Sequence, residues 1–348
     1  METTACVEQV KTAPPSLSRA VSICLVGQHP WTTKLEETLN QSGRSDLHAF
    51  VLPLNRRGPL CLEQVLSADI FIRVGFRPGA PTWRGRVFDA VWSTLRMLNP
   101  GAVRVFYWLG TDVLNTTQDF KAGTLRQRSY AQAIRDHHLA DATWLAEELL
   151  EVGITALPKT ITIPELMVGE TPHLPSHFSV LSYVPDTRHS FYGGDCIYEA
   201  ARRLPDIRFD VVGGSGVWVS KPLPNLVFHG WQKDMKNFHR NATVLVRLVK
   251  HDGTGLTALE ALSFGRHVIY SHPLPYSIRV GWGDTDTLVE KVSELFDLHQ
   301  LGLLRPNMSG SAYVQKRFNH QACTEDLISY LLELSASQRA GRPAHNGQ

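Results

Sequence analysis

From Val21 onward the chain alternates between two hydrophobic patterns. Short runs rich in Val, Ile and Leu are typical of strands that are buried on both faces. The segments between them carry apolar residues every three or four positions, as amphipathic helices do. The pattern predicts strands over 21–26, 48–52, 69–74, 103–109, 178–184, 207–212, 226–230, 243–249 and 267–270, and helices over 31–40, 83–98, 191–204, 256–262 and 287–298. Such regular alternation predicts an α/β protein with doubly wound parallel sheets.

One break in this alternation divides the chain into two domains. Residues 158–175 contain four prolines and no periodicity, which is typical of a linker between domains. We therefore predict a first domain over 21–165, in which 140–158 forms a closing strand, helix and strand, then a linker over 166–177 and a second domain over 178–320. The polar ends, 1–20 and 337–348, are predicted to be a disordered leader and tail.

The segment Thr243–Ser271 carries the clearest pattern of a ligand site. Its strand gives way to a polar turn with two glycines, Gly253 and Gly255, and then to a helix that Gly265 ends. The turn therefore lies at the carboxyl end of a strand, where open α/β sheets bind ligands. The glycines allow close approach of the backbone, and the helix start offers free N–H groups and about half a positive charge.

The charged residues of this turn suggest what it binds. Basic side chains and helix N–H groups predict a phosphate or diphosphate site made of Lys250, His251, Gly253, Thr254, Gly255, Leu256 and Thr257. Two acids, Asp252 and Glu260, have no use in binding an anion but suit ribose or sugar hydroxyls. A diphosphate beside such hydroxyls describes a nucleotide sugar. The alternative is that Asp252 is only a turn or capping residue.

The stretch from Asp252 through Glu260-Ala261-Leu262-Ser263-Phe264-Gly265 to Ile269 resembles the donor-site signature of GT-B glycosyltransferases related to family 4, the group 1 glycosyltransferases. In that signature an acid, seven further residues and a Glu precede a helix of small residues, a Gly and a strand. The first acid is usually Glu, where this chain has Asp252. The resemblance covers about 178–334 well and the first domain faintly. It implies two Rossmann-like domains that face a central cleft, with a last helix over 321–336 that packs back on the first domain.

The resemblance also implies roles for residues. Glu260 would hold the ribose, Asp252 would act on the transferred sugar, and Arg188 would bind the diphosphate of a UDP- or GDP-sugar. The usual Lys-Gly before the helix is Gly193-Gly194 here, so Lys250 is predicted to supply the second cation. Gly214 would lie against the nucleoside. Retention of the anomeric configuration is implied as well. No cofactor and no metal are required, because a helix dipole and basic side chains can stabilise the leaving group.

The acceptor side is expected in the first domain. Gly110, Thr111 and Asp112 follow the 103–109 strand, and Trp108–Leu114 resembles a cleft-facing loop of the family. Asp112 is therefore a candidate for acceptor binding or for a catalytic base, although it also suits a helix cap. Gly27 and His29 follow the first strand in the same way and are placed on the acceptor side.

Composition and charge narrow the remaining choices. A net charge of +2 gives no argument for nucleic acid, and no apolar run reaches the roughly 20 residues that span a bilayer. The five cysteines are scattered, which fits a reducing cytoplasm. The region 44–104 is locally basic, and it is either a solvated face or a patch for an anionic acceptor or lipid headgroups, made of Arg56, Arg57, Arg73, Arg77, Arg84, Arg86 and Arg96.

Two smaller motifs receive structural interpretations. Asp284-Thr285-Asp286 is a DxD, but its position before a helix favours capping over metal binding. His137 and His138 are assigned to a helix end, where a cationic His is tolerated.

The resemblance thus implies a cytoplasmic glycosyltransferase of polysaccharide biosynthesis, and contact with the membrane surface through the basic region stays open beside the solvated face. Its acceptor would be a glycan, a lipid-linked glycan or a small molecule. Two alternatives stay open on the same scaffold: a nucleotide-sugar epimerase or sugar phosphorylase, and a non-catalytic subunit that binds nucleotide sugars.

Overall fold

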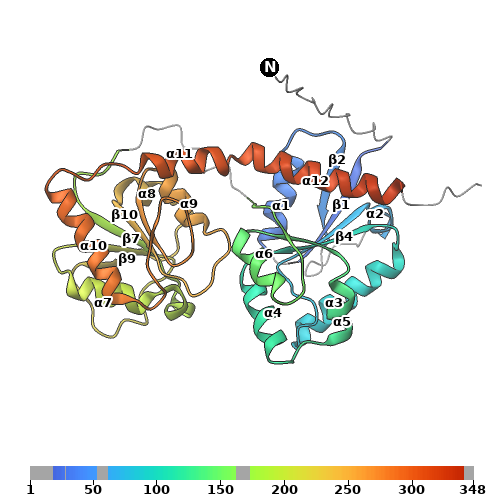
Figure 1. The fold of residues 1–348 in the computed structure, drawn as a ribbon, viewed down its shortest axis with the longest axis horizontal. Coiled ribbons are helices and arrows are strands. Elements are labelled where there is room, and N and C mark those ends of the chain that lie inside the picture. Colours follow the sequence, from blue (N-terminus) through green and yellow to red (C-terminus); the bar gives the residue numbers. More distant parts are fainter. Residues whose placement is uncertain (1–18, 28, 53–61, 162–172, 341–348) are drawn as a thin grey trace, which may run out of the picture.

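A computed structural model describes residues 19–27, 29–52, 62–161 and 173–340. They form two α/β domains that lie side by side, with α11 and α12 running along one edge of both (Figure 1). Each domain contains one six-stranded sheet, and all the strand pairs are parallel. The predicted fold class, two doubly wound Rossmann-like domains, is confirmed.

The first domain has the strand order β2-β1-β3-β4-β5-β6. Its strands are β1 (Val21–Gly27), β2 (Leu47–Val51), β3 (Ile70–Val74), β4 (Val103–Trp108), β5 (His137–Ala140) and β6 (Leu157–Pro158). Its helices are α1 (Trp31–Asn40), α2 (Leu62–Ser67), α3 (Trp83–Leu98), α4 (Thr111–Lys121), α5 (Gln127–Ala133) and α6 (Thr143–Leu150).

The second domain has the strand order β12-β11-β10-β7-β8-β9. Its strands are β7 (Ser179–Tyr183), β8 (Arg208–Val212), β9 (Leu226–Phe228), β10 (Val244–Arg247), β11 (His267–Tyr270) and β12 (Ile278–Arg279). Its helices are α7 (Gly194–Arg203), α8 (Lys236–Asn241), α9 (Leu256–Ser263), α10 (Thr285–Gln300) and α11 (Met308–Arg317), with 3₁₀ turns η2 (Asp186–Arg188) and η3 (Ser190–Tyr192).

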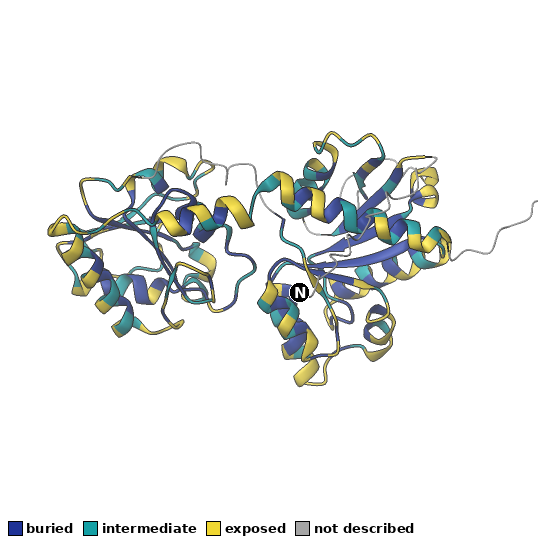
Figure 2. Cartoon of the chain, turned by 45° about the horizontal axis from the view of Figure 1, so that its top comes forward, coloured by how far each residue is buried: buried dark blue, intermediate teal, exposed yellow. Residues whose placement is uncertain are grey.

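Both faces of each sheet are buried, so the strands appear dark blue in Figure 2 while the outer sides of the helices are exposed. Alternate side chains of β4 serve two different cores. Phe106 and Trp108 pack into one cluster, and Val105 and Tyr107 pack into the cluster on the other face. This explains why the central strands read as unbroken apolar runs.

The last helix, α12 (His320–Ala340), follows the second domain in sequence but packs on the first. Leu327, Ile328 and Leu331 are buried in the cluster formed with β1 and β3. The helix continues to Ala340, so residues 337–340 are helical rather than part of the predicted tail. The remaining tail, the leader up to residue 18 and most of the predicted linker lie outside the described residues.

Some predictions about individual segments are confirmed and others are wrong. Asp284 caps α10 by accepting a hydrogen bond from the Thr287 N–H at 3.1 Å, as expected. His137 and His138 were assigned wrongly, because they begin β5 instead of ending a helix. The helix expected from Phe191 starts only at Gly194, since Gly193 has a φ of +69° and separates it from a 3₁₀ turn.

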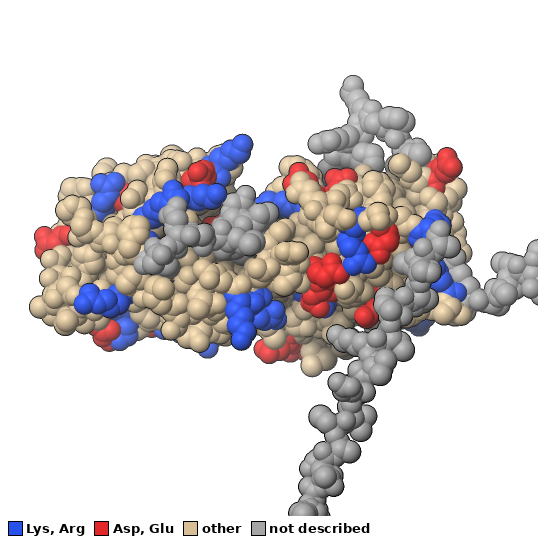
Figure 3. Space-filling model, turned by 90° about the horizontal axis from the view of Figure 1, so that it is seen from above, with Lys and Arg blue, Asp and Glu red and all other residues tan. Residues whose placement is uncertain are grey.

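The fold leaves little of the predicted basic patch exposed. Arg73 is 1% exposed and pairs with Asp89 at 2.9 Å, and Arg96 pairs with Asp136 at 2.6 Å. Arg56 and Arg57 lie outside the described residues. Helix α3 lies away from α12 (Figure 1), and the opposite face, on the side of α12, carries intermixed acidic and basic side chains (Figure 3). Of the seven arginines, only Arg84 and Arg86 are described as exposed.

Candidate active site

The carboxyl ends of the two sheets face each other, and their loops touch. A Cβ atom on Gly253, in the loop after β10, would lie 2.3 Å from the Leu109 carbonyl oxygen after β4. A Cβ on Gly110 would lie 2.9 Å from the Gly253 nitrogen. Glycine at both positions is therefore required for the two backbones to meet, which makes this contact the floor of the cleft between the domains.

Four hydrogen bonds tie the 251–254 loop to the first domain. The Thr254 hydroxyl donates to the Asp141 carbonyl at 2.6 Å, and the Thr254 N–H donates to the Asp141 carboxylate at 3.2 Å. The Trp144 indole donates to the Asp252 carbonyl at 3.2 Å. His251 Nε2 lies 2.8 Å from Glu148 Oε2. The side chains of His251 and Thr254, predicted to face a phosphate, are thus engaged with the first domain.

Asp141 is a buried acid at this junction. Its second carboxylate oxygen accepts the Ile161 N–H at 3.0 Å. Burial raises the pKa of Asp141 to about 6, while the hydrogen bonds from Thr254 and Ile161 act in the opposite direction. The domain contact therefore contains a carboxyl group that titrates near neutral pH.

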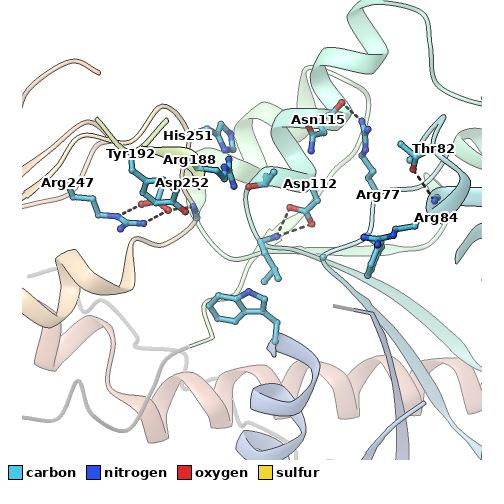
Figure 4. Close-up of a pocket in the computed structure, with 18 residues that line it drawn as sticks. Arg77, Thr82, Arg84, Asp112, Asn115, Arg188, Tyr192, Arg247, His251 and Asp252 are labelled. Atoms are coloured by element: carbon cyan, nitrogen blue, oxygen red, sulfur yellow. Dashed lines mark hydrogen bonds and ion pairs between the residues drawn. The ribbon is translucent and has the colours of Figure 1, made fainter. Parts of the chain in front are cut away.

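Two cavities flank the contact and share Trp31, Leu109, Arg247, Asp252 and Gly253 as walls. The α9 cavity, about 360 Å³ in volume, is also lined by Gly213, Thr254, Gly255, Leu256, Thr257 and Glu260. The α3 cavity, about 590 Å³, is also lined by Arg77, Arg84, Asp112, Asn115, Arg188 and His251 (Figure 4). Either volume is large enough to hold part of a small-molecule ligand.

The α9 cavity brings together a helix start and an acid. Gly255 precedes α9 with a φ of +69°, and a Cβ there would lie 2.5 Å from the Tyr270 hydroxyl. The first N–H groups of α9 have no partner within the helix and carry its positive dipole end. Further along α9, Glu260 Oε2 lies 3.1 Å from Nε2 of the buried His239, which fixes the orientation of the carboxylate.

Asp252 forms a buried ion pair with Arg247, the last residue of β10. Arg247 Nε and Nη2 donate to its two oxygens at 2.6 and 2.9 Å (Figure 4). The Tyr270 hydroxyl donates at 2.9 Å and the Gly253 N–H at 3.1 Å. A carboxylate offers about four acceptor positions, and these four donors occupy them. Asp252 is therefore engaged with Arg247, and its predicted action on the transferred sugar stays a prediction.

Burial and neighbouring charges determine the protonation states of Arg247 and Tyr270. Burial alone would lower the pKa of Arg247, but the charge and hydrogen bonds of Asp252 raise it above its ordinary value. Burial, assisted by the charge of Asp252, raises the pKa of Tyr270 well above its ordinary value. Arg247 is thus always a cation and Tyr270 always a hydroxyl donor. Nη1 of Arg247 takes no part in the pair with Asp252.

Asp112 lies in the first turn of α4 and is buried. Its Oδ1 accepts N–H groups from Gly110 at 2.8 Å, Leu109 at 3.0 Å and Val113 at 3.1 Å. Burial raises the pKa of Asp112, and these backbone hydrogen bonds oppose the shift. The carboxylate thus stabilises the turn before α4, but the N-cap of α4 is Gly110, so the capping interpretation of Asp112 is wrong. It also lines the α3 cavity, so a role towards an acceptor stays a prediction.

Other predicted residues fall in different places. Arg188 lines the α3 cavity with its guanidinium 4.0 Å from the Phe191 ring, and Thr111 lines it too. Lys250 is exposed, lines neither cavity and lies 5.0 Å from the Trp282 ring. Gly27, His29 and Gly214 line neither cavity, although their neighbours Trp31 and Gly213 do.

Three residues of the site were not predicted from the sequence: Arg247, Tyr270 and His239. Arg247 had a usable signal, because a charge inside an apolar strand must find a partner once it is buried. Tyr270 and His239 are ordinary residues of predicted elements, and their roles depend on contacts across the fold.

The second domain and the overall fold are similar to those of known glycosyltransferases. Residues 192–297 match the family model of the "Glycosyl transferases group 1". Sucrose-phosphate synthase from Thermosynechococcus elongatus superposes with a TM-score of 0.65 at 15% identity, over 91% of this chain and 100% of that one. Alr3699/HepE from Anabaena, solved in complex with UDP-glucose, gives 0.62 at 13% identity, over 90% and 99%. A search of curated protein sequences found no match.

A third structure, WaaG, "a glycosyltransferase involved in lipopolysaccharide biosynthesis", has a TM-score of 0.55 at 13% identity, over 90% of this chain and 99% of that one. Fold and site together define a two-domain GT-B protein. Residues 192–297, which lie in its second domain, are similar to the group 1 glycosyltransferases.

Proposed function

We propose that the protein transfers a sugar from a UDP- or GDP-sugar, bound in the α9 cavity, to an acceptor in the α3 cavity. The observation that carries the proposal is the junction of the two cavities at Arg247 and Asp252, between the start of α9 and the first domain. A donor and an acceptor bound on either side of that junction would meet there. The similarity in fold to a protein solved with UDP-glucose supports this assignment of the donor.

The donor would lie along α9. The nucleoside would contact Gly213, and its ribose hydroxyls would bind Glu260, which His239 orients. The diphosphate would accept hydrogen bonds from the N–H groups at the start of α9. Carboxylate–hydroxyl bonds and helix–phosphate contacts are both charge-assisted and therefore stronger than neutral hydrogen bonds.

Arg247 would supply the cation that the family's Lys-Gly normally provides. Asp252 holds it rigidly, and Nη1 stays available for the diphosphate. Arg188 would approach from the α3 side. Fixed donors aimed at the leaving diphosphate stabilise the negative charge that develops in the transition state, without reorganisation at the moment of reaction.

Several finer points belong to the same proposal. Retention of configuration and a reaction without metal follow from the family resemblance, and a cytoplasmic location follows from the scattered cysteines. Among the described residues, no group of three or more His, Cys, Asp and Glu is arranged to hold a metal ion. No helix in the described part of the chain has the length and apolar character needed to cross a bilayer.

Contact with the membrane surface would depend on Arg84 and Arg86 beside the exposed Trp83. Co-sedimentation of the protein with vesicles tests this contact.

The direct test is a panel of UDP- and GDP-sugars incubated with the protein and candidate acceptors, followed by assay of free nucleoside diphosphate. The proposal expects release from one donor class, and a marked loss of release in Glu260→Ala. Conversion of the donor sugar without release would favour an epimerase. Nucleotide binding with no turnover on any pair would favour a non-catalytic subunit.

A further inference from the structure

The walls of the α3 cavity carry more positive than negative charge. Four guanidinium groups line it, from Arg77, Arg84, Arg188 and Arg247, against the carboxylates of Asp112 and Asp252. Two of the four are compensated, because Arg247 pairs with Asp252 and Arg77 pairs with Asp119. No ion pair joins Arg84 or Arg188 to any acid in the described part of the chain.

The two uncompensated arginines belong to opposite walls. Arg188 comes from the second domain and lies beside Arg247, where the proposed function places the diphosphate of the donor. Arg84 comes from the first turn of α3 in the first domain. The Arg84 guanidinium lies 5.5 Å from the centroid of the ring of its neighbour Trp83. This cation–π contact uses none of its hydrogen-bond donors.

The wall around Arg84 is rigid. Buried Arg73 donates to the carbonyls of Phe76 at 2.9 Å and Arg77 at 3.0 Å. Asp89, which pairs with Arg73, accepts the Gly79 N–H at 3.0 Å. These bonds fix the loop between β3 and α3. The backbone that carries Arg84 therefore needs no ordering when an anion binds, which lowers the entropic cost of binding.

We infer that the acceptor carries an anionic group, a phosphate monoester or a carboxylate, which Arg84 binds on the first-domain wall of the α3 cavity. This inference rests on the proposed function, because it places the acceptor opposite the donor. The acceptor hydroxyl would lie towards Asp112 and the Arg247–Asp252 pair, with its charged group turned away from the donor phosphates. An arginine there favours a planar or tetrahedral oxyanion over a neutral sugar.

The test uses protein saturated with UDP, so that the donor site is occupied and added anions report on the α3 cavity. Calorimetry compares glucose with glucose 6-phosphate, glucose 1-phosphate and glucuronate. At least one anionic probe should bind about tenfold more tightly than glucose, and Arg84→Gln should remove that preference while Arg84→Lys keeps part of it. Arg86→Gln is the matched control, because Arg86 is exposed on the same helix and does not line the cavity.

The inference is overturned if no anionic probe exceeds glucose, or if Arg84→Gln and Arg86→Gln behave alike. Vesicles of phosphatidylglycerol and of phosphatidylcholine separate a lipid source from a soluble one. An equal loss of vesicle binding in both variants, with unchanged sugar-phosphate affinity, would show a general membrane surface and also overturn it. If UDP fails to bind, the proposed function fails, but the comparison of the two arginine variants in unloaded protein still decides the anion site.

Discussion

Arg247 and Asp252 form a two-point ion pair across the turn that follows β10, with N–O distances of 2.6 and 2.9 Å. The pair lies where the α9 and α3 cavities meet, and both side chains are largely buried. The pair matters because it fixes the position of the Arg247 guanidinium. A guanidinium held at both ends of its fork has one fixed position, so Asp252 fixes the Arg247 guanidinium between the proposed donor and acceptor sites.

Asp252→Asn should therefore destabilise the folded protein. It leaves a buried arginine without its counter-charge, and breaking such a pair on one side costs about 3 kcal/mol or more of the free energy of unfolding. Arg247→Gln should lose a similar amount, and the double variant should lose less than the sum of the two. Urea unfolding measures all three proteins. Additive losses would show that the two residues do not act as a unit.

Glu260→Gln should weaken UDP binding. The substitution removes the charge that strengthens hydrogen bonds to the ribose hydroxyls while it keeps the shape, so we expect a loss of about tenfold in affinity. Calorimetry with UDP measures it. Glu294→Gln, on the outer side of α10, is a control that should leave UDP affinity unchanged. Equal affinities in all three proteins would remove Glu260 from the donor site.

Gly253→Ala should separate the domains at the floor of the cleft. Its Cβ would meet the Leu109 carbonyl oxygen at 2.3 Å, which backbone on both sides cannot accommodate without movement. A displacement of about 1 Å at reacting groups can cost up to a hundredfold in rate, so kcat/KM should fall by at least about tenfold. Gly281→Ala is the control, because its Cβ would meet only Asp284 at 3.8 Å. Unchanged kcat/KM in Gly253→Ala would show that the loops separate freely during turnover.

Asp141 should make stability depend on pH. Its pKa is raised to about 6 in the folded protein from an unfolded value near 3.8, so the folded state binds the proton more tightly. The stabilisation from protonation is complete below about pH 4 and is lost as the pH rises through 6. At about 1.4 kcal/mol per pKa unit this amounts to roughly 3 kcal/mol. Asp141→Asn should lack this slope in urea unfolding between pH 4.5 and 7.5, and a parallel slope in both proteins would contradict the assignment.

The local order of elements was readable from the sequence, because each element carries its own periodicity. The β10–α9–β11 unit and its two acids were found in this way, since glycines, helix start and acids lie within one short segment. Lys250 shows the limit of that approach. The residue at a strand end that faces a cavity is set by the direction in which the chain leaves the sheet. Here Arg247 lines both cavities and Lys250 lines neither.

Contacts between the domains could not be predicted from pattern at all. Thr254 and His251 look like phosphate ligands in sequence, yet their side chains meet Asp141 and Glu148 more than a hundred residues away. Similarly, Arg73 looked like part of a surface patch because its strand neighbours do not reveal Asp89, its buried partner. Long-range pairing of charges decides both cases, and only the fold supplies it.

The central claim is that the α9 cavity binds the nucleoside diphosphate of the donor. A crystal structure of the protein with UDP or GDP tests it most directly. The account predicts diphosphate density over the backbone of 254–257 and within reach of Arg247, with the ribose hydroxyls on Glu260. Nucleotide density elsewhere, with these residues unoccupied, would contradict it.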